Sequence, residues 1–455
     1  IRGIDSRAAL ALPGVHAVLF AEDIPGDNNV GPARHDEPLL AVDEVFYQGQ
    51  LIALVVGDSI AICRDAAALV EVDYEPLPPL LGIEAALAAS SFHTEPHQLA
   101  RGDVDAALAT APLSFDGTFD FGGQEHFYLE TQAAWAEPSP EGGENDTILV
   151  SSSTQHPSEI QAMVAHVLGL ERHQVVSRST RMGGGFGGKE TQGNAFAALV
   201  ALAAQKTRRP VRIQLDRDLD MAITGKRHPF HARFRVGHDN QGNLLAAAVD
   251  LTSDGGWSLD LSQAILDRAL FHLDNAYFVP ACRFRGRVAK TNVASNTAFR
   301  GFGGPQGMLV IEEILDRVAR RAGLAPEIVR QRNLYRPGAN ETHYDVDLGD
   351  DRIGEVWRRV IDQAEFATRR DEIDAWNRSH PNVKRGLAVT PVKFGISFTM
   401  THFNQAGALV LLYVDGTAQV NHGGTEMGQG LHTKIRGIVM RELGLSEEAV
   451  RVMPT

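Results

Sequence analysis

The stretch that decides the fold is RMGGGFGGKET, which runs from Arg181 to Thr191. Five of the six positions 183–188 are glycine, and the acid Glu190 follows shortly after them. β-Branched residues at 173–178 indicate a strand before the stretch, and an apolar run at 195–204 indicates a helix after it. Because glycine carries no Cβ, backbone N–H groups at the start of such a helix can approach an anionic ligand closely. The stretch therefore predicts an anion-binding loop between a strand and a helix.

Two common nucleotide-binding patterns fit this loop only in part. Positions 183–188 match the G-x-G-x-x-G pattern of dinucleotide-binding folds, but the acid expected about 20 residues later is missing, and Asp216 lies too far along. Positions 183–189 also match the start of a phosphate loop, in which a Ser or Thr that binds magnesium comes next. Glu190 takes that place, and its carboxylate would repel the phosphates. The loop alone also leaves open a tight turn between two packed elements.

Two further glycine-dense segments have the same setting. They are FRGFGGPQ at residues 299–306 and HGGTEMGQG at residues 422–430, and each precedes a helical pattern. A single loop of this kind can be a matter of architecture. Three of them suggest one large polar ligand that is held by backbone groups from several directions.

Composition excludes several classes of protein. A chain of 455 residues predicts about three domains, and its net charge of -14 argues against nucleic acid as a partner. The longest apolar run, at 195–204, is far shorter than the ~20 residues needed to span a bilayer. The two cysteines, Cys63 and Cys282, cannot hold an iron–sulfur cluster between them, and they argue for a reducing, cytoplasmic setting.

The chain divides into an N-terminal unit, a linker and two further units. Residues 1–82 are expected to form a small α+β unit, with strands at 15–20, 45–48, 51–56 and 71–74 and a helix at 59–70. Clustered prolines then end regular structure, so residues 83–107 are expected to be a linker.

The larger second unit is predicted at residues 108–345. It has strands at 232–236 and 244–251 with a hairpin turn at 239–243 between them, and helices at 194–206 and 307–321. Residues 346–455 begin a third unit, with strands at 386–391, 408–414 and 450–453 and a helix at 431–443. Because this unit shows no closing strands before Thr455, we expect the chain to be truncated.

Six segments together closely resemble the xanthine dehydrogenase/oxidase family, in the form of its molybdopterin-binding large subunit. In chain order, and at family-like spacing, they are residues 123–131, 181–191, 267–272, 296–306, 393–399 and 423–434. The resemblance implies an α+β fold in which an α/β hammerhead domain precedes two elongated, mixed α/β molybdenum-cofactor-binding domains, the second incomplete here. In the family a pterin dithiolene holds the molybdenum, so no direct protein ligand to the metal is expected.

The resemblance also assigns cofactor contacts by position. They fall on Gln155, Phe186, Gly187, Arg300, Gly428 and Gln429. Gln155 matches the glutamine that hydrogen-bonds a molybdenum oxo group. Without the resemblance, Gln155 would be read as a solvated loop residue and Arg300 as part of a weak surface ion pair.

Substrate contacts follow in the same way. Glu190 and Arg268 match a polar pair that grips a purine from opposite ends and takes part in catalysis. Phe302 and Phe398 match two aromatic residues that sandwich the purine ring, and Thr399 lines the same pocket. Without the resemblance, each phenylalanine would more often be a core residue. Arg268 is expected to stabilise negative charge that develops on the ring, and the pKa of Glu190 is expected to be raised.

The implied activity is that of a molybdenum hydroxylase in purine catabolism, which oxidises hypoxanthine and xanthine to uric acid. The resemblance implies attack by a molybdenum-bound hydroxide with hydride transfer, and electron flow through [2Fe–2S] centres and FAD to NAD. Those centres would lie on a partner subunit or on other domains, and the catalytic halves would pair as a dimer. The family's general base is expected beyond Thr455, not at Glu130 or Glu426, so the chain alone is expected to be inactive.

Three alternatives remain beside this interpretation. The nearest is an aldehyde oxidase-like enzyme that acts on aldehydes or other N-heterocycles, although the pairing of Glu190 with Arg268 favours purines. The second is a nucleotide-binding enzyme that uses Lys189 in a phosphate loop. The third is a noncatalytic relative, which would be expected to have lost site residues that this chain retains.

Overall fold

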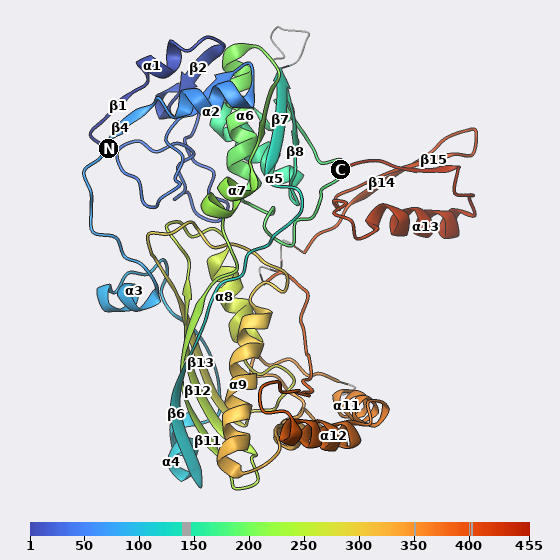
Figure 1. Ribbon diagram of the computed structural model, residues 1–455. Helices are drawn as coiled ribbons and strands as arrows, with labels where there is room; N and C mark the ends of the chain where they lie inside the picture. Colours follow the sequence, from blue (N-terminus) through green and yellow to red (C-terminus); the bar gives the residue numbers. More distant parts are fainter. Residues whose placement is uncertain (139–146, 350–351, 400, 402–403) are drawn as a thin grey trace.

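The computed structural model describes residues 1–138, 147–349, 352–399, 401 and 404–455. The molecule is elongated (Figure 1), with the N-terminal unit at one end beside helices α5 (Pro157–Leu168) and α6 (Gly193–Thr207). A long sheet with helices α8 (Ser262–Phe271) and α9 (Gly304–Ala322) forms the other end. The C-terminal strands and helix α13 (Leu431–Leu443) project to one side.

The N-terminal unit is built from two small antiparallel pairs and two helices. Strand β1 (Gly3–Asp5) pairs with β4 (Glu71–Asp73), β2 (Val15–Leu19) pairs with β3 (Leu54–Gly57), and the helices are α1 (Arg7–Leu10) and α2 (Ile60–Ala67). The Ser59 hydroxyl caps α2 by accepting from the Ile62 N–H, as its place before an apolar run predicts. The helix and the strands near 15, 54 and 71 are confirmed.

The predicted strand at 45–48 is wrong. These residues form a loop in which the Phe46 N–H donates to the Gln50 side chain. The rings of Phe46 and Tyr47 pack against Trp257 of the second unit, each with a centroid separation of 5.7 Å. These rings are therefore partly covered by a contact between units and not by a neighbouring strand.

A four-stranded sheet lies beside the N-terminal unit and shares a core with it. Its order is β10 (Val211–Gln214), β7 (Ala133–Pro138), β8 (Ile148–Ser152), β9 (Val175–Arg178). Strands β8 and β9 run parallel, with Ile148 opposite Val175, and α5 makes the crossover. The apolar run predicted as a helix is the fully buried part of α6, which packs in one cluster with Leu39 and Leu40.

The five-stranded sheet forms the long body of the molecule (Figure 1). Its order is β5 (His97–Arg101), β13 (Ala281–Ala289), β12 (Leu244–Asp254), β11 (Phe230–His238), β6 (Leu113–Phe121). The hairpin predicted between β11 and β12 is confirmed, with Gly242 at φ 78°. One face of α9, with Ile311, Ile314, Leu315 and Val318, is buried against this sheet. Helix α10 (Pro326–Asn333) adds Val329 to the same core, whereas α7 (Arg217–Ile223) packs Ile223 against the core of the four-stranded sheet.

The segment 83–107 has more structure than a plain linker. It contains helix α3 (Ile83–Ala89) and strand β5, and it runs into helix α4 (Val104–Thr110). Strand β5 pairs antiparallel with β13, so that Cys282 lies opposite Arg101. The domain boundaries themselves stay a prediction.

The C-terminal part begins with helices α11 (Ile353–Gln363) and α12 (Phe366–Ser379). A sheet of β14 (Ala408–Leu412), β15 (Ala418–His422) and β16 (Val450–Val452) follows, and Val439 of α13 packs with its apolar cluster. The predicted strand at 386–391 is wrong. Its last residue, Pro391, accepts a hydrogen bond from the side chain of Asn275 (2.9 Å), so the segment crosses to the second unit without pairing in a sheet.

Residues 391–399, which we call the strap, continue along the second unit. None of the helices in the part of the chain that the structure describes is both long and apolar enough to cross a membrane.

Candidate functional site

The three glycine-rich loops converge on one cavity of about 530 Å³. All the predicted cofactor contacts line it, namely Gln155, Phe186, Gly187, Arg300, Gly428 and Gln429. The three loops lie more than one hundred residues apart in the sequence, so the fold alone brings them together. Glu190 and Phe302, which are predicted to contact substrate, also line this cavity.

Main-chain hydrogen bonds tie the loops to one another. The Arg300 N–H donates to the Phe186 carbonyl (2.8 Å), which joins the second loop to the first. The Met182 N–H donates to the Glu426 carbonyl (3.0 Å), which joins the first loop to the third. These main-chain bonds fix the three loops relative to one another around the cavity.

Close approach explains two of the glycines in the first loop. A Cβ at Gly185 would lie 2.5 Å from the Gln155 side-chain oxygen, and a Cβ at Gly187 would lie 2.8 Å from the Ala298 carbonyl oxygen. Gly187 also has φ 99°, where an L side chain is strained. Phe186 adopts φ 54° and Phe302 φ 50°, a conformation that costs of order 1–3 kcal/mol and persists where the surroundings impose it.

Gln155 is fixed by the first loop. Its side-chain Oε1 accepts from the Gly187 N–H (2.9 Å) and the Lys189 N–H (3.4 Å). The backbone N–H of Gln155 donates to the Lys189 carbonyl (2.7 Å). With the oxygen held in this way, the amide orientation is set by the backbone. A polar side chain in a defined orientation thus faces the cavity.

Lys189 does not serve as a phosphate-binding lysine in this structure. It is fully buried, and its Nζ donates to the Glu130 carbonyl and the Ser153 hydroxyl, both at 2.7 Å. Burial lowers its pKa to about 8. The ammonium group therefore supports the loop from within, which argues against the nucleotide-binding alternative.

Two acids in the loops also have structural partners. The Glu130 carboxylate accepts from the Gly183 N–H. The Glu426 carboxylate accepts from the backbone N–H groups of Gly428 (2.9 Å), Gly430 (3.1 Å) and His432 (3.0 Å). Both carboxylates are thus occupied with holding loop backbone.

The donor set of the first cavity fits an anionic cofactor such as a molybdopterin. Helix α9 begins directly after Gly303 and α13 directly after Gly430, so two helix N-termini lie next to the lining loops. A wall of backbone groups with Arg300 suits phosphate and polar ring edges. Among the described residues, no group of three His, Cys, Asp or Glu could hold a metal ion.

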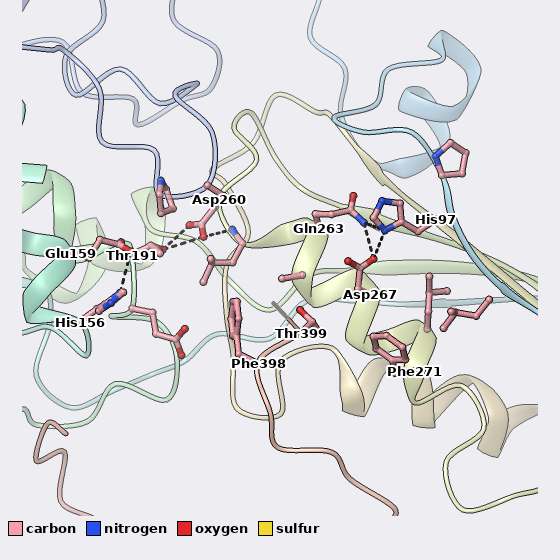
Figure 2. A pocket seen from close by; sticks show the side chains of 18 of the residues that line it. His97, His156, Glu159, Thr191, Asp260, Gln263, Asp267, Phe271, Phe398 and Thr399 are labelled. Carbon is pink, nitrogen blue, oxygen red and sulfur yellow. Dashed lines mark hydrogen bonds and ion pairs between the residues drawn. The ribbon is translucent and has the colours of Figure 1, made fainter. Parts of the chain in front are cut away.

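A second, larger cavity of about 960 Å³ adjoins the first (Figure 2). Phe398 and Thr399 line it together with His156, Glu159 and Asp260. Glu190 lines both cavities. The two cavities thus share one ionisable wall residue.

The environment of Glu190 favours its protonated form. Burial, together with the neighbouring Asp260 carboxylate, raises the pKa of Glu190 to about 7, while His156 works in the opposite direction. The protonated carboxyl is thus stabilised relative to that of an exposed glutamate. Such a group can donate or accept a hydrogen bond at either face of the shared wall.

Sequence reasoning missed two features near Glu190. Asp260 is buried and accepts from the Thr191 hydroxyl (2.9 Å) and the Gln192 amide (2.8 Å), and burial raises its pKa to about 6. His156 and Glu159 pair at 3.1 Å on the cavity wall. The spacing of His156 and Glu159 at i and i+3 was a usable signal, whereas nothing in the local sequence singles out Asp260.

Arg268 is buried but engaged elsewhere. Its guanidinium donates to the carbonyls of Gly395 and Ser397 in the strap, and its Nε is buried without a partner among the described residues. Burial lowers its pKa. The described lining of the two cavities does not include Arg268, so the grip on substrate opposite Glu190 stays a prediction.

Phe302 and Phe398 meet at the boundary between the cavities. Their ring centroids are 5.4 Å apart with a 57° angle between the planes. A ring stacked between two others needs parallel planes roughly 7 Å apart, twice the ordinary contact distance. The rings touch each other here, so the sandwich also stays a prediction. Thr399 lines the second cavity, and its hydroxyl is buried without a partner among the described residues.

Comparison with family models defines the class of protein. The aldehyde oxidase and xanthine dehydrogenase a/b hammerhead domain matches residues 1–78, and models of the molybdopterin cofactor-binding domain match residues 90–334 and 359–455. The chain therefore consists of a hammerhead domain and molybdopterin cofactor-binding domains.

Curated relatives narrow this class. The xanthine dehydrogenase of Drosophila subobscura is 45% identical over 458 residues, which is 100% of this chain and 34% of that protein. The xanthine dehydrogenase of Emericella nidulans is 44% identical over 99% of this chain and 33% of its own length. The chain belongs to the xanthine dehydrogenase family, and it spans about a third of the length of these relatives.

Solved structures agree with the fold. Quinoline 2-oxidoreductase from Pseudomonas putida 86 has a TM-score of 0.89 at 25% identity, covering 100% of this chain and 61% of that one. The aldehyde oxidoreductase from Desulfovibrio gigas has a TM-score of 0.85 at 26% identity, covering 100% of this chain and 51% of that one. The expected fold class, a hammerhead domain followed by mixed α/β molybdenum-cofactor-binding domains, is confirmed.

Proposed function

We propose that the full protein is a molybdenum hydroxylase that oxidises hypoxanthine and xanthine to uric acid. The observation that carries the proposal is the place of Glu190, a group that titrates near neutral pH on the wall shared by the two cavities. A purine in the larger cavity would meet this group where the cofactor cavity begins.

The residues of the first cavity would hold the cofactor. The backbone at Phe186–Gly187 and Gly428–Gln429, with Arg300, suits its anionic and polar edges, and Gln155 would fix its orientation. When bound, the molybdenum cofactor supplies the hydroxylation and two-electron chemistry. The protein's contribution is positioning and exclusion of water.

The residues of the second cavity would hold the purine. Protonated Glu190 can donate to a ring nitrogen or a ring carbonyl, and in its ionised form it can accept from a ring N–H. Arg268 would stabilise negative charge on the heterocycle through its remaining N–H groups, an effect of a few kcal/mol in comparable sites. Phe302 and Phe398 would cover the ring faces once the two rings move apart.

Electrons from the substrate need carriers outside this chain, because its two cysteines do not form an iron–sulfur site. Cys63 is partly exposed and Cys282 is buried on a strand of the long sheet, so neither helps to build a cluster. Partner domains or a subunit with [2Fe–2S] centres and FAD, with NAD as acceptor, therefore belong to the proposal. So do a dimer of catalytic halves and a cytoplasmic location. We expect no purine turnover from this chain alone.

An aldehyde oxidase-like enzyme is the second candidate. The observation that favours it is the engagement of Arg268 with the strap carbonyls, which leaves less of the guanidinium for a purine. The structural neighbours named for aldehyde and quinoline oxidation show that the same fold occurs in proteins with other substrates in their names.

One experiment tests the proposed function. The full-length protein with its partner is analysed for molybdenum and pterin, and xanthine-dependent NAD reduction is then measured. Cofactor with turnover supports the proposal. Cofactor without xanthine turnover moves the substrate towards aldehydes or other N-heterocycles, and absence of molybdenum and pterin from a host that makes them contradicts it.

A further inference from the structure

The strap lies along one face of the end of α8 and the turn after it. Arg268, His272 and Asn275 are spaced i, i+4 and i+7, and all three bind strap atoms. Asn275 accepts from the Lys393 N–H (3.2 Å) and donates to the Pro391 carbonyl (2.9 Å). This face therefore fixes the strap at several points along its length.

His272 is the central contact and joins the strap to Arg268. The Gly395 N–H donates to His272 Nε2 (3.1 Å), so this nitrogen is the acceptor. The proton must then sit on Nδ1, which donates to the Arg268 carbonyl (2.8 Å). The ring is buried and lies against Phe394 with a centroid separation of 5.0 Å. One neutral tautomer of His272 satisfies both partners.

His272 is connected to the larger cavity, the proposed substrate cavity, through the strap. On one side, Arg268 holds the carbonyls of the strap with its guanidinium. On the other, the strap ends in Phe398 and Thr399, which line the larger cavity. A separate anchor, from Lys393 Nζ to Asp274 at 2.5 Å, keeps the strap on the second unit if the His272 contact is lost. Loss of His272 would thus reorient the strap without releasing it.

We propose that His272 is a positioning residue that sets the orientation of the strap relative to Arg268, and through it the shape of the substrate cavity at Phe398 and Thr399. The substrate in this inference rests on the proposed function, whereas the docking of the strap does not. The role differs from that of a catalytic group, because His272 acts through the residues that it holds.

The test compares His272→Phe with His272→Asn in the full-length holoenzyme. His272→Phe keeps a ring beside Phe394 but removes both hydrogen bonds, while His272→Asn keeps a side chain that can donate and accept. We expect the KM for xanthine to rise about tenfold in His272→Phe, as for loss of a hydrogen bond, with kcat and molybdenum content unchanged. His272→Asn is expected to restore part of the KM. Amide exchange of residues 393–398 is expected to be faster in His272→Phe.

His228→Phe is the matched control, because His228 is a buried histidine whose Nε2 bonds Ser262 at the start of the same helix (2.7 Å). An equal rise of KM in this control would overturn the inference, as would unchanged strap exchange or unchanged KM in His272→Phe. If His272→Phe loses its molybdenum, the same two measurements, the KM for xanthine and amide exchange of the strap, are made on His272→Asn. Values equal to those of wild type and of the control would then overturn the inference. A wild-type enzyme that binds cofactor but fails to oxidise xanthine refutes the proposed function, and strap exchange still tests His272.

Discussion

The two cavities are built in different ways. In the first cavity, which we propose holds the cofactor, main-chain hydrogen bonds such as those from Arg300 to Phe186 and from Met182 to Glu426 join the loops. We call these bonds the backbone frame, and the Glu426 carboxylate supports it by accepting from loop N–H groups. The second cavity, which we propose holds the substrate, is lined in part by the strap, which side chains such as Arg268 hold. We therefore expect substitutions at the first cavity to act through the loop backbone, and those at the second to act through single side-chain contacts.

The largest effect, on cofactor content, should come from adding a Cβ to a glycine of the backbone frame. Gly187→Ala places a Cβ 2.8 Å from the Ala298 carbonyl oxygen at φ 99°, so the loop must move. We expect the full-length protein to lose most of its molybdenum and pterin, which metal and pterin analysis measures. Gly423→Ala is the control, since its Cβ would meet nothing within 4 Å. Equal cofactor content in both variants would contradict the backbone frame.

The second effect concerns the pH dependence of purine binding at the second cavity. The pKa of Glu190 is raised to about 7, and we expect the protonated form to bind the purine. The kcat/KM for xanthine should then fall about tenfold per pH unit above 7, and this limb should vanish in Glu190→Gln. The sign for stability follows from the same shift. The folded state binds the proton of Glu190 more tightly than the unfolded state does, since the pKa is raised from its ordinary value of 4.5 to about 7. The contribution of Glu190 to the free energy of unfolding is therefore present at low pH and is lost as the pH rises between these two values.

Stability measurements across that range provide a check that needs no substrate. Relative to wild type, Glu190→Gln should gain free energy of unfolding as pH rises through this window, as measured by urea denaturation. Burial also raises the pKa values of Glu37 and Asp260, so the comparison must be between variant and wild type at each pH. A difference that does not depend on pH would show that Glu190 titrates normally.

The smallest effect should come from Lys189, and it should be on stability. Lys189→Met nearly keeps the length of the side chain but leaves the Glu130 carbonyl and the Ser153 hydroxyl without their donor. We expect a loss of about 1–3 kcal/mol in free energy of unfolding by urea denaturation. Lys206→Met removes only a partly exposed pair with Asp23 and should cost less than about 1 kcal/mol. ATP binding that depends on Lys189 would instead revive the phosphate-loop interpretation.

Much of the fold could be predicted because local signals agreed with tertiary partners. The helix predicted at 431–443 matches α13, and the glycine loops predicted to share a ligand do share a cavity. The strands predicted at 45–48 and 386–391 fail for a common reason. Their apolar residues are mostly only partly buried, and the contacts of Phe46 and Val389 are with another unit and not with a neighbouring strand. A short apolar pattern does not tell which of these partners it will meet.

The site was less predictable where it depends on side chains from distant segments. The family resemblance picked out six residues that line the first cavity, but it could not show that the Arg268 guanidinium is held by strap carbonyls. Neither could it show that Phe302 and Phe398 touch. Asp260 was missed because its importance lies in burial beside Glu190, and burial of a single acid leaves no pattern in the sequence.

The central claim is that Glu190 selects purines at the wall between the two cavities. The most direct test is the ratio of kcat/KM for xanthine to that for an aromatic aldehyde, in wild-type full-length enzyme and in Glu190→Ala with equal molybdenum content. We predict that the variant loses about a hundredfold in the xanthine value, a few kcal/mol of transition-state stabilisation, and little in the aldehyde value. An unchanged ratio would contradict the claim, and Glu190 would then be only a wall residue of the two cavities.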